Sequence, residues 1–237
     1  KTATCDVSTF TQQYSGGETT SIYNKRYDLS GRRLTRLDAG LYSGGAIWRT
    51  IHLDVTYDNN KIYFISADNS ADTGLVVDID NAGRALRAEA GKIIDDGFGP
   101  QEFSYENGRL NLINIDSNWM RIWFRYDGYG NNTQIVTDST SDGLARINHV
   151  YQYDHTNKIK RHSYLDEARG FSFNVLTILQ AAGFFPALDP VHARTRTTVN
   201  WGPYLAYDFK NFDHTYDKDG RLLQYKTAEP GSSSPVA

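Results

Sequence analysis

The chain has 237 residues, of which 39% are hydrophobic and 13% aromatic, enough apolar surface for a sizeable core and unlike the composition of a disordered chain. Lys and Arg number 25 against 28 Asp and Glu, so the net charge is −3, and without a basic block no nucleic-acid partner is expected. The single cysteine, Cys5, has no second thiol for an intramolecular disulfide or a structural zinc site, so we expect packing to hold the fold.

The first residues are polar, KTATCDVSTFTQQYSGGETT, and we expect a linker over residues 1–19. Such a linker is what remains when an upstream export signal is removed, so we expect export, with a lipid anchor upstream of Lys1 as an open alternative. The most apolar stretch, FSFNVLTILQAAGFF, is interrupted by Asn174, Gln180 and Gly183. We therefore expect no membrane-spanning helix.

A short phrase recurs along the chain. Its first residue, aromatic or β-branched, suits the end of a strand, and the Asp that follows can accept a hydrogen bond from backbone two residues on. Gly or Asn then tolerates the positive φ that closes a hairpin. Seven near-copies are too many for chance, and each predicts a hairpin tip. They are YDLSGRRL from Tyr27, YDNNKIYF from Tyr57, IDNAGRAL from Ile79, YENGRL from Tyr105, YDGYGNN from Tyr126, YDHTNKI from Tyr153 and YDKDGRLL from Tyr216.

Runs of alternating apolar and polar residues lie between the tips. In IWRTIHLDVTY the alternation has period two, which predicts a strand with one buried and one polar face. Gly-, Asp- and Ser-rich pieces such as TDSTSDG fall where the opposite ends of the hairpins should turn. The predicted buried face of that strand comprises Ile47, Ile51, Leu53, Val55 and Tyr57, and its polar face Trp48, Thr50, His52 and Asp54.

The predicted fold is an all-β, antiparallel, up-and-down meander of a dozen or more strands. Open twisted sheets rarely exceed about ten strands without curling or splitting, so we expect an open or partly closed barrel, with a two-sheet sandwich as the second choice. One short helix is expected near 174–182, where Asn174 can cap its start and Gly183 and Pro186 end it. Because that helix is apolar all round, we expect it to be buried inside the curled sheet.

The predicted domain organisation is simple. A single β-meander domain should span residues 20–227. The Pro- and Ser-rich tail, residues 228–237, is expected to be flexible.

The Tyr-Asp-x-x-Gly-Arg phrase resembles the YD repeat of RHS-type proteins, and it is similar to secreted or lipid-anchored proteins of Bacteroides-type bacteria that carry such hairpins in one modest domain. The match covers the tips from Tyr27 to Leu222, and the late helix followed by TTVNWGPYLAYDFKNFDHTYDKDGRL favours the second group. RHS shells enclose a cargo with far more repeats than this chain has. The resemblance implies an extracytoplasmic protein in the periplasm or at the outer-membrane surface of a Gram-negative bacterium, and it supplies no catalytic residues.

The pattern WMRIWFRY is the first candidate binding site. Its alternation should place Met120, Ile122, Phe124 and Tyr126 on one face. Tryptophan rings flanked by guanidinium donors can stack on sugar rings and bind acidic groups. The alternative is a ladder within the sheet, in which arginine stems cover the rings. The candidate residues, on the other face, are Trp119, Arg121, Trp123 and Arg125.

Two further patterns are weaker candidates. Trp48 and His52, with Asp54, form a second polar set on another predicted strand. The stretch DIDNAGRALRAE has the acidic spacing of a calcium loop, but Ala82 stands at a ligand position and a strand precedes it, so we interpret it as a plain hairpin turn. We expect no metal site.

The expected function is a non-catalytic, extracytoplasmic binding or structural module, with a glycan or another envelope protein as its partner. The sequence has no nucleophile elbow, no metalloprotease helix and no phosphate-binding loop, so an enzyme is not the first interpretation and no cofactor is expected. Two alternatives stay open, a glycoside hydrolase whose carboxylate pair comes from distant strands, and a porin-like envelope barrel. The oligomeric state stays open as well.

Overall fold

The structure is a computed structural model of the chain. It divides into two compact units, residues 1–100 with 168–184 and residues 101–167 with 185–237, and each unit is described by itself. The single domain over 20–227 stays a prediction. The structure describes residues 9–13, 19–28, 30, 33–43, 45–94, 99–139, 147–158, 175–184, 192–201, 204–216, 218 and 222–228.

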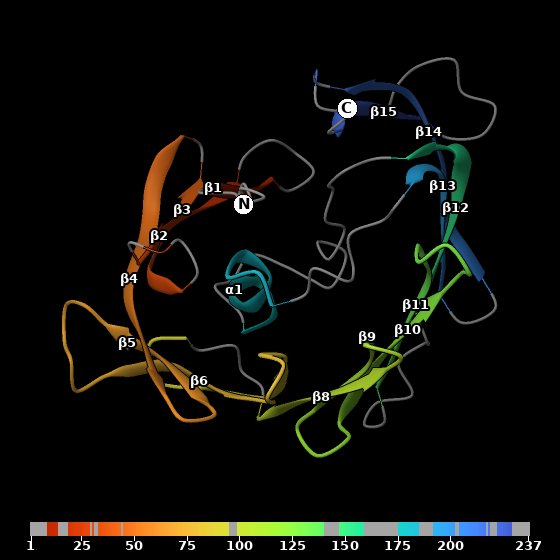
Figure 1. The fold of residues 1–237 in the computed structure, drawn as a ribbon. Coiled ribbons are helices and arrows are strands. Elements are labelled where there is room, and N and C mark those ends of the chain that lie inside the picture. The colour runs from red at the N-terminus through yellow and green to blue at the C-terminus, as the bar shows by residue number, and fades with distance from the viewer. Residues whose placement is uncertain are drawn as a thin grey trace. The chain divides into compact units, whose positions relative to one another are not determined.

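The first unit contains one antiparallel sheet in which each strand pairs with the next along the chain (Figure 1). The first strand lies inside the segment expected to be a linker, where Thr and Phe suit an extended backbone. The strands are β1 (Thr9–Gln13), β2 (Thr19–Tyr27), β3 (Leu34–Ser43), β4 (Ala46–Asp58), β5 (Lys61–Ser66), β6 (Thr73–Ile79) and β7 (Ala85–Ala90).

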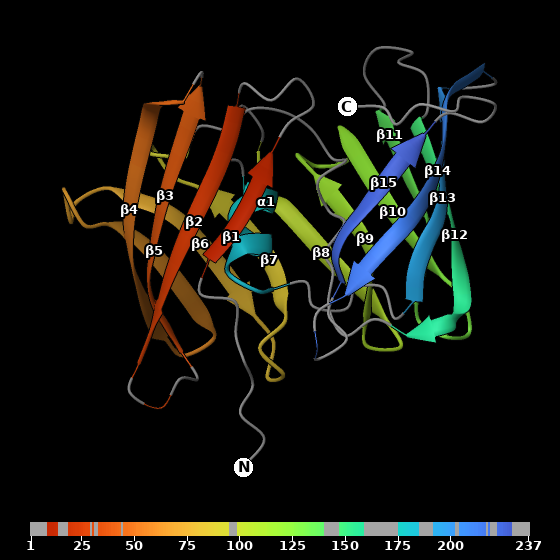
Figure 2. The ribbon, with the colours of Figure 1, turned by 90° about the horizontal axis from the view of Figure 1, so that it is seen from above.

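The second unit repeats this arrangement, with neighbouring strands again antiparallel and in chain order (Figure 2). The prediction of an all-β, up-and-down meander is confirmed, and the described residues include a single helix. The strands are β8 (Gln101–Glu106), β9 (Arg109–Ile115), β10 (Met120–Tyr126), β11 (Asn132–Ser139), β12 (Ile147–Lys158), β13 (His192–Trp201), β14 (Tyr204–Tyr216) and β15 (Leu222–Ala228).

The repeated phrase forms hairpin tips. In the tip after Ile79, the Asp80 carboxylate accepts the backbone N–H groups of Ala82 and Arg84, both at 2.9 Å, and Gly83 has a φ of +79°. This is the Asp-started turn that the phrase predicts. The copies from Tyr57, Tyr105 and Tyr126 also join consecutive paired strands, so the prediction is confirmed for four copies. In the copies from Tyr27 and Tyr216 the flanking strands pair as well, but most of the turn residues, 29, 31, 32, 217 and 219–221, lie outside the described residues.

The copy from Tyr153 is the exception, and the prediction of a tip is wrong there. Strand β12 continues through it to Lys158, which pairs with His192 at the start of β13. Between these two strands in sequence, the described residues 175–184 contain the helix. A tight turn is impossible where the next strand in sequence begins more than 30 residues later.

The tyrosine of the phrase ties one tip to the preceding one. The Tyr57 hydroxyl donates to the Leu34 carbonyl at 3.1 Å, and the Tyr126 hydroxyl donates to the Leu110 carbonyl at 2.8 Å. Burial raises the pKa of both tyrosines, so their hydroxyls stay protonated as donors. The arginine after the turn completes the contact, with Arg33 over Tyr57 at 5.2 Å and Arg109 over Tyr126 at 5.4 Å. In these two pairs, the tyrosine of one copy thus stabilises the tip of the copy before it.

Strand β4 departs from the predicted alternation at its start. Ile51, Leu53 and Val55 are buried as expected, but Ile47 is 61% exposed. The pairing shifts from Leu41 with Arg49 to Tyr42 with Ile47, which leaves Trp48 as an extra residue in a bulge. Because a bulge reverses the side of every residue beyond it, the prediction that Ile47 shares the buried face is wrong.

The helix α1 (Val175–Ala181) belongs to the first unit, whose curved sheet bends around it (Figure 1). Six of its seven residues are buried, as predicted for a short helix that is apolar all round. It ends in a Schellman motif, in which Phe184 N–H donates to the Leu179 carbonyl and Gly183, with a φ of +89°, donates to Gln180. Asn174 and Pro186 lie outside the described residues.

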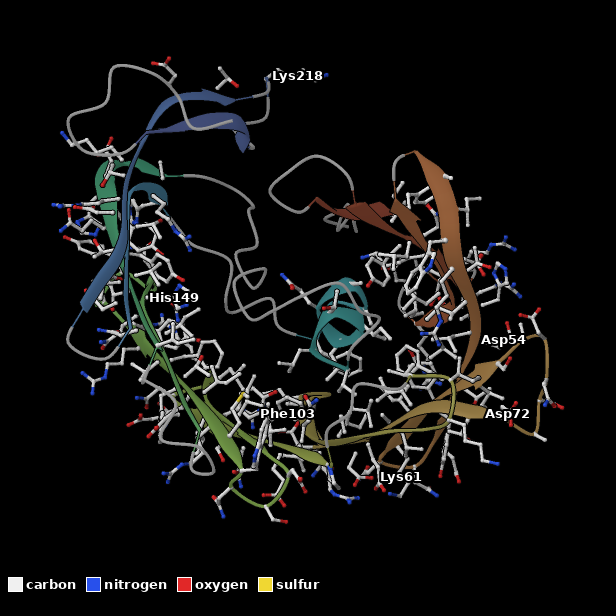
Figure 3. The ribbon with its side chains drawn as sticks, turned by 180° about the vertical axis from the view of Figure 1, so that it is seen from behind. Asp54, Lys61, Asp72, Phe103, His149 and Lys218 are labelled. Carbon is white, nitrogen blue, oxygen red and sulfur yellow. The ribbon has the colours of Figure 1, made fainter. Side chains whose placement is uncertain are left out.

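The sheet of the first unit has one apolar and one charged face. Tyr23, Leu37, Leu53, Phe64 and Val77 are buried on one side. Figure 3 shows Asp54 and Lys61 pointing to the other side, away from α1. Ion pairs cross this outer face, from Lys61 to Asp78, from Arg36 to Asp38 and Asp54, and from Arg87 to Glu89.

Candidate functional site

The polar face of β10 is the main predicted site, in the second unit. Met120, Ile122 and Phe124 are buried, and the residues between them, Arg121 and Trp123, are half-buried on the opposite face. The Arg121 guanidinium lies over the Trp123 ring, 5.0 Å from its centre. The predicted alternation of β10 is confirmed, and the stacking is the contact that either interpretation of this face expects.

Hydrogen-bonding side chains flank this stack on neighbouring strands. By register, Arg121 lies opposite Asn114 of β9 and Asp138 of β11, and Arg125 lies opposite Gln134. The Asn114 amide donates to Glu102 at 3.3 Å, and the Gln134 amide donates to Asn148 at 2.7 Å. Trp123 itself lies opposite Leu112 of β9 and Val136 of β11, so the indole has apolar neighbours across the sheet, and the polar side chains lie on either side of it.

Arg121 and Arg125 lack the carboxylate partners that several other arginines have, as does Arg109 of β9, which lies over the Tyr126 ring. Arg36, Arg84, Arg87 and Arg196 all pair with carboxylates. Within the part of the chain that the structure describes, the side chains of Arg121 and Arg125 make neither a hydrogen bond nor an ion pair, and Arg121 Nε is buried without an acceptor. Their guanidinium N–H groups are therefore available to donate hydrogen bonds to a ligand.

Trp119 lies in the turn before β10 and not on the strand. Asp116, Ser117 and Asn118 have successive φ values of 47°, 51° and 81°, and Trp119 N–H closes the turn on the Asp116 carbonyl at 3.0 Å. Three left-handed residues in a row are uncommon outside Gly and Asn. The alternation therefore extends from Arg121 to Arg125, and Trp119 is held by a separate turn.

The second predicted set lies in the first unit and does not form a joint site. His52 is bound to Asp38, with its Nδ1 2.8 Å from a carboxylate oxygen. Burial disfavours the ionised form of Asp38, but hydrogen bonds from His52 and Arg36 outweigh it and lower its pKa. Trp48 is 68% exposed in the bulge, and no ring contact or hydrogen bond to His52 occurs among the described residues. His52 is explained by the ion-pair network of the outer face.

The calcium-like stretch is a hairpin tip, as interpreted. Asp80 is occupied by the turn, and its pKa is lowered by hydrogen bonds from the backbone and side chain of Arg84. Asp78 pairs with Lys61, and Glu89 pairs with Arg87. In the described ranges, no group of three or more His, Cys, Asp or Glu side chains could hold a metal ion.

A cluster that the sequence did not predict surrounds the tip between β10 and β11. Asp127 accepts the N–H groups of Tyr129 and Asn131 at 2.9 Å on one oxygen, and the Asn131 side-chain amide at 2.8 Å on the other. His155 of β12 adds a contact from its Nε2 to that second oxygen at 3.2 Å. His192 is 1% exposed, and its N–H donates to the Asn131 side chain at 2.9 Å.

Aromatic rings complete this cluster. Tyr129 stacks on His155, with ring centres 4.7 Å apart. It also makes a T-shaped contact with His192, with ring centres 5.5 Å apart. Tyr129 is nevertheless 62% exposed. The signal in the sequence was the departure from the repeated phrase, because YDGYGNN has a tyrosine and YDHTNKI a histidine at positions where no other copy has either residue. The fold places these two departures side by side.

Asp127 should contribute stability that depends on pH. Burial opposes its ionisation, but hydrogen bonds from Asn131 and His155 outweigh burial and lower its pKa below 3.8. Its contribution is complete above the unfolded value of 3.8 and is lost as the pH falls through the lower folded pKa. Asp127→Asn should therefore reduce the free energy of unfolding by about 1.5–3 kcal/mol at pH 7, and by much less near pH 2, in urea titrations.

The matched control for this prediction is Asp138→Asn. Asp138 makes no hydrogen bond or ion pair with a described residue, so its replacement should change the free energy of unfolding by less than about 0.5 kcal/mol. An Asp127→Asn deficit of equal size at both pH values would show that the carboxylate charge contributes nothing.

Comparisons with known proteins bear on the fold. No family model matches the chain, and no curated protein matches it. A porin-like protein from Bacteroides uniformis has a similar structure, with a TM-score of 0.60 and 14% identity over 93% of this chain and 88% of that chain. A porin-like protein from Bacteroides vulgatus has a TM-score of 0.58 and 13% identity over 97% of this chain and 95% of that chain.

Among the described residues, no helix has the length and hydrophobicity that crossing a membrane requires. At 14% and 13% identity, the two solved structures are similar to this chain in fold alone. The chain thus has the all-β fold of two porin-like Bacteroides proteins, and its YD-repeat membership remains a resemblance.

Proposed function

We propose that this protein is a non-catalytic binding or structural module of a Gram-negative cell envelope, working outside the cytoplasm, and that its ligand is a glycan. The envelope location is supported by the fold that the chain shares with porin-like proteins of Bacteroides. The proposed location is the periplasm or the outer-membrane surface. A lipid anchor is part of the same proposal.

The observation that carries the glycan is the unpaired state of Arg121 and Arg125 beside Trp123. A sugar ring can stack on the indole, while guanidinium groups donate to hydroxyl, carboxylate or sulfate oxygens. Packing alone explains why Arg121 covers Trp123, but it does not explain why two arginines lack the carboxylates that Arg36 and Arg196 have. Acidic glycans are the favoured class for this face.

The test is a thermal-shift screen against neutral and acidic glycans, because a ligand of the folded state raises the unfolding midpoint. We expect a shift with an acidic class, and a loss of about tenfold in affinity for Trp123→Ala. Trp48→Ala, at an exposed tryptophan of the other unit, is the matched control and should leave binding unchanged. If acidic glycans still bind with unchanged affinity to both the Trp123→Ala and the Arg121→Ala variants, the polar face of β10 is not their binding site.

A glycoside hydrolase is not supported by the four described carboxylates whose pKa is shifted. Such an enzyme needs a general acid whose pKa is raised. Asp38, Asp80, Asp127 and Asp208 all have a lowered pKa, because arginine, histidine or backbone donors bind them. These groups stay ionised and are poor proton donors near neutral pH.

The porin-like alternative is favoured by the fold of the two neighbours. A lipid-facing wall, however, carries an outward apolar band, and a Lys or Arg at mid-membrane costs about 2–4 kcal/mol. In the first unit α1 lies on the apolar face, and ion pairs such as Lys61 to Asp78 cross the other face. We therefore place the water-exposed module first. Aggregation of the purified chain in all buffers without detergent would favour the barrel instead.

A further inference from the structure

Tyr129 and His155 form a second surface in the second unit, on different elements from the β10 face. We propose that this pair, the Tyr129 platform, binds a neutral pyranose ring by stacking on the exposed tyrosine. The proposal goes beyond the acidic-glycan site, since it concerns another ligand class and other residues.

The tips after Asp80 and Asp127 have the same turn. In both, one carboxylate oxygen accepts the N–H groups two and four residues on, and the residue three positions on is a glycine with positive φ, Gly83 or Gly130. Ala82 occupies the position that Tyr129 has in the second tip. Because alanine suffices for this turn, the turn does not require the aromatic ring.

The ring of Tyr129 is exposed but held in place. His155 stacks on it at 4.7 Å, His192 contacts it at 5.5 Å, and its backbone N–H is bound by Asp127. At 62% exposure, much of the ring remains open to solvent. A large aromatic surface that is already ordered loses little conformational entropy on binding, which is the property of recognition tyrosines.

The groups around the ring suit hydroxyls and not a charged ligand. Nε2 of His155 lies 3.2 Å from the Asp127 carboxylate, and in the tautomer that donates to this carboxylate the Nδ1 atom of the neutral ring is an acceptor. Neither Nδ1 of His155 nor the Tyr129 hydroxyl has a hydrogen-bond partner among the described residues. Both can bind sugar hydroxyls at the rim of the platform, while the nearby carboxylate disfavours acidic sugars.

The test uses ligand-observed saturation-transfer NMR and calorimetry on the full chain, with neutral oligosaccharides of glucose, mannose, xylose and N-acetylglucosamine, and with acidic oligosaccharides as the second panel. We expect a neutral class to bind, and Tyr129→Ala to weaken it by about tenfold. Tyr129→Phe keeps the stacking and should cost only about threefold. Because Tyr129→Ala reproduces the Ala82 tip, the variant should stay folded, which circular dichroism checks.

The outcomes separate the two proposals. Trp123→Ala should weaken acidic binding and leave neutral binding unchanged, and Tyr129→Ala should do the reverse. Two results would overturn the proposal for the Tyr129 platform. One is that Tyr129→Ala does not weaken the binding of neutral oligosaccharides, and the other is that none of them binds at millimolar concentration. If Trp123→Ala abolishes only the binding of acidic oligosaccharides, the proposal for the Tyr129 platform is supported, because neutral binding is then independent of the β10 face.

Discussion

Gly91→Ala should destabilise the first unit by about 3 kcal/mol or more, because the substitution places a methyl group against backbone. Gly91 follows β7, and its N–H donates to the Gly74 carbonyl at 2.8 Å. A Cβ on Gly91 would lie 2.7 Å from the Thr73 carbonyl carbon and closer still to the Thr73 oxygen. Relief requires β6 and β7 to separate, which breaks their pairing. Urea unfolding followed by circular dichroism measures the loss.

The matched control is Gly128→Ala. No atom lies within 4 Å of a Cβ at Gly128, and its backbone is outside the left-handed region. Its replacement should change the free energy of unfolding by less than about 0.5 kcal/mol. Equal stability of the Gly91→Ala and Gly128→Ala proteins would contradict the close approach of β6 to the residue after β7.

Ile178→Ala should reduce the free energy of unfolding by about 2–5 kcal/mol. Ile178 is 0% exposed at the centre of α1, and truncation leaves a cavity where the helix packs in the first unit. A seven-residue helix is too short to be stable by itself, so its burial is what holds it. Thermal and urea unfolding of the variant measure the effect.

Ile47→Ala is the control for this substitution, since it removes the same atoms from a side chain that is 61% exposed. The free energy of unfolding should change by less than about 0.5 kcal/mol. If both isoleucine variants lost the same small amount of stability, α1 would be a loosely attached helix and not part of the core.

The two candidate surfaces differ in how far the sequence could predict them. The β10 face was predictable because period two determines which of Met120, Arg121, Ile122 and Trp123 share a side. Whether an arginine finds a carboxylate depends on the register with the next strands, which no local pattern encodes. The Tyr129 platform was missed for the same reason, because Asp127 and His155 are 28 residues apart.

Sequence alone determined the parts of this protein that depend on neighbours along the chain. Alternation determined the strands, Asp with Gly or Asn determined the tips, and an all-apolar segment ended by Gly183 determined the buried helix, since each follows from backbone preference and one-sided burial. Tertiary structure decided the bulge at Trp48, the close approach at Gly91 and the meeting of Tyr129 with His155. These depend on strand register and on distances between remote residues, which chain packing sets and periodicity does not contain.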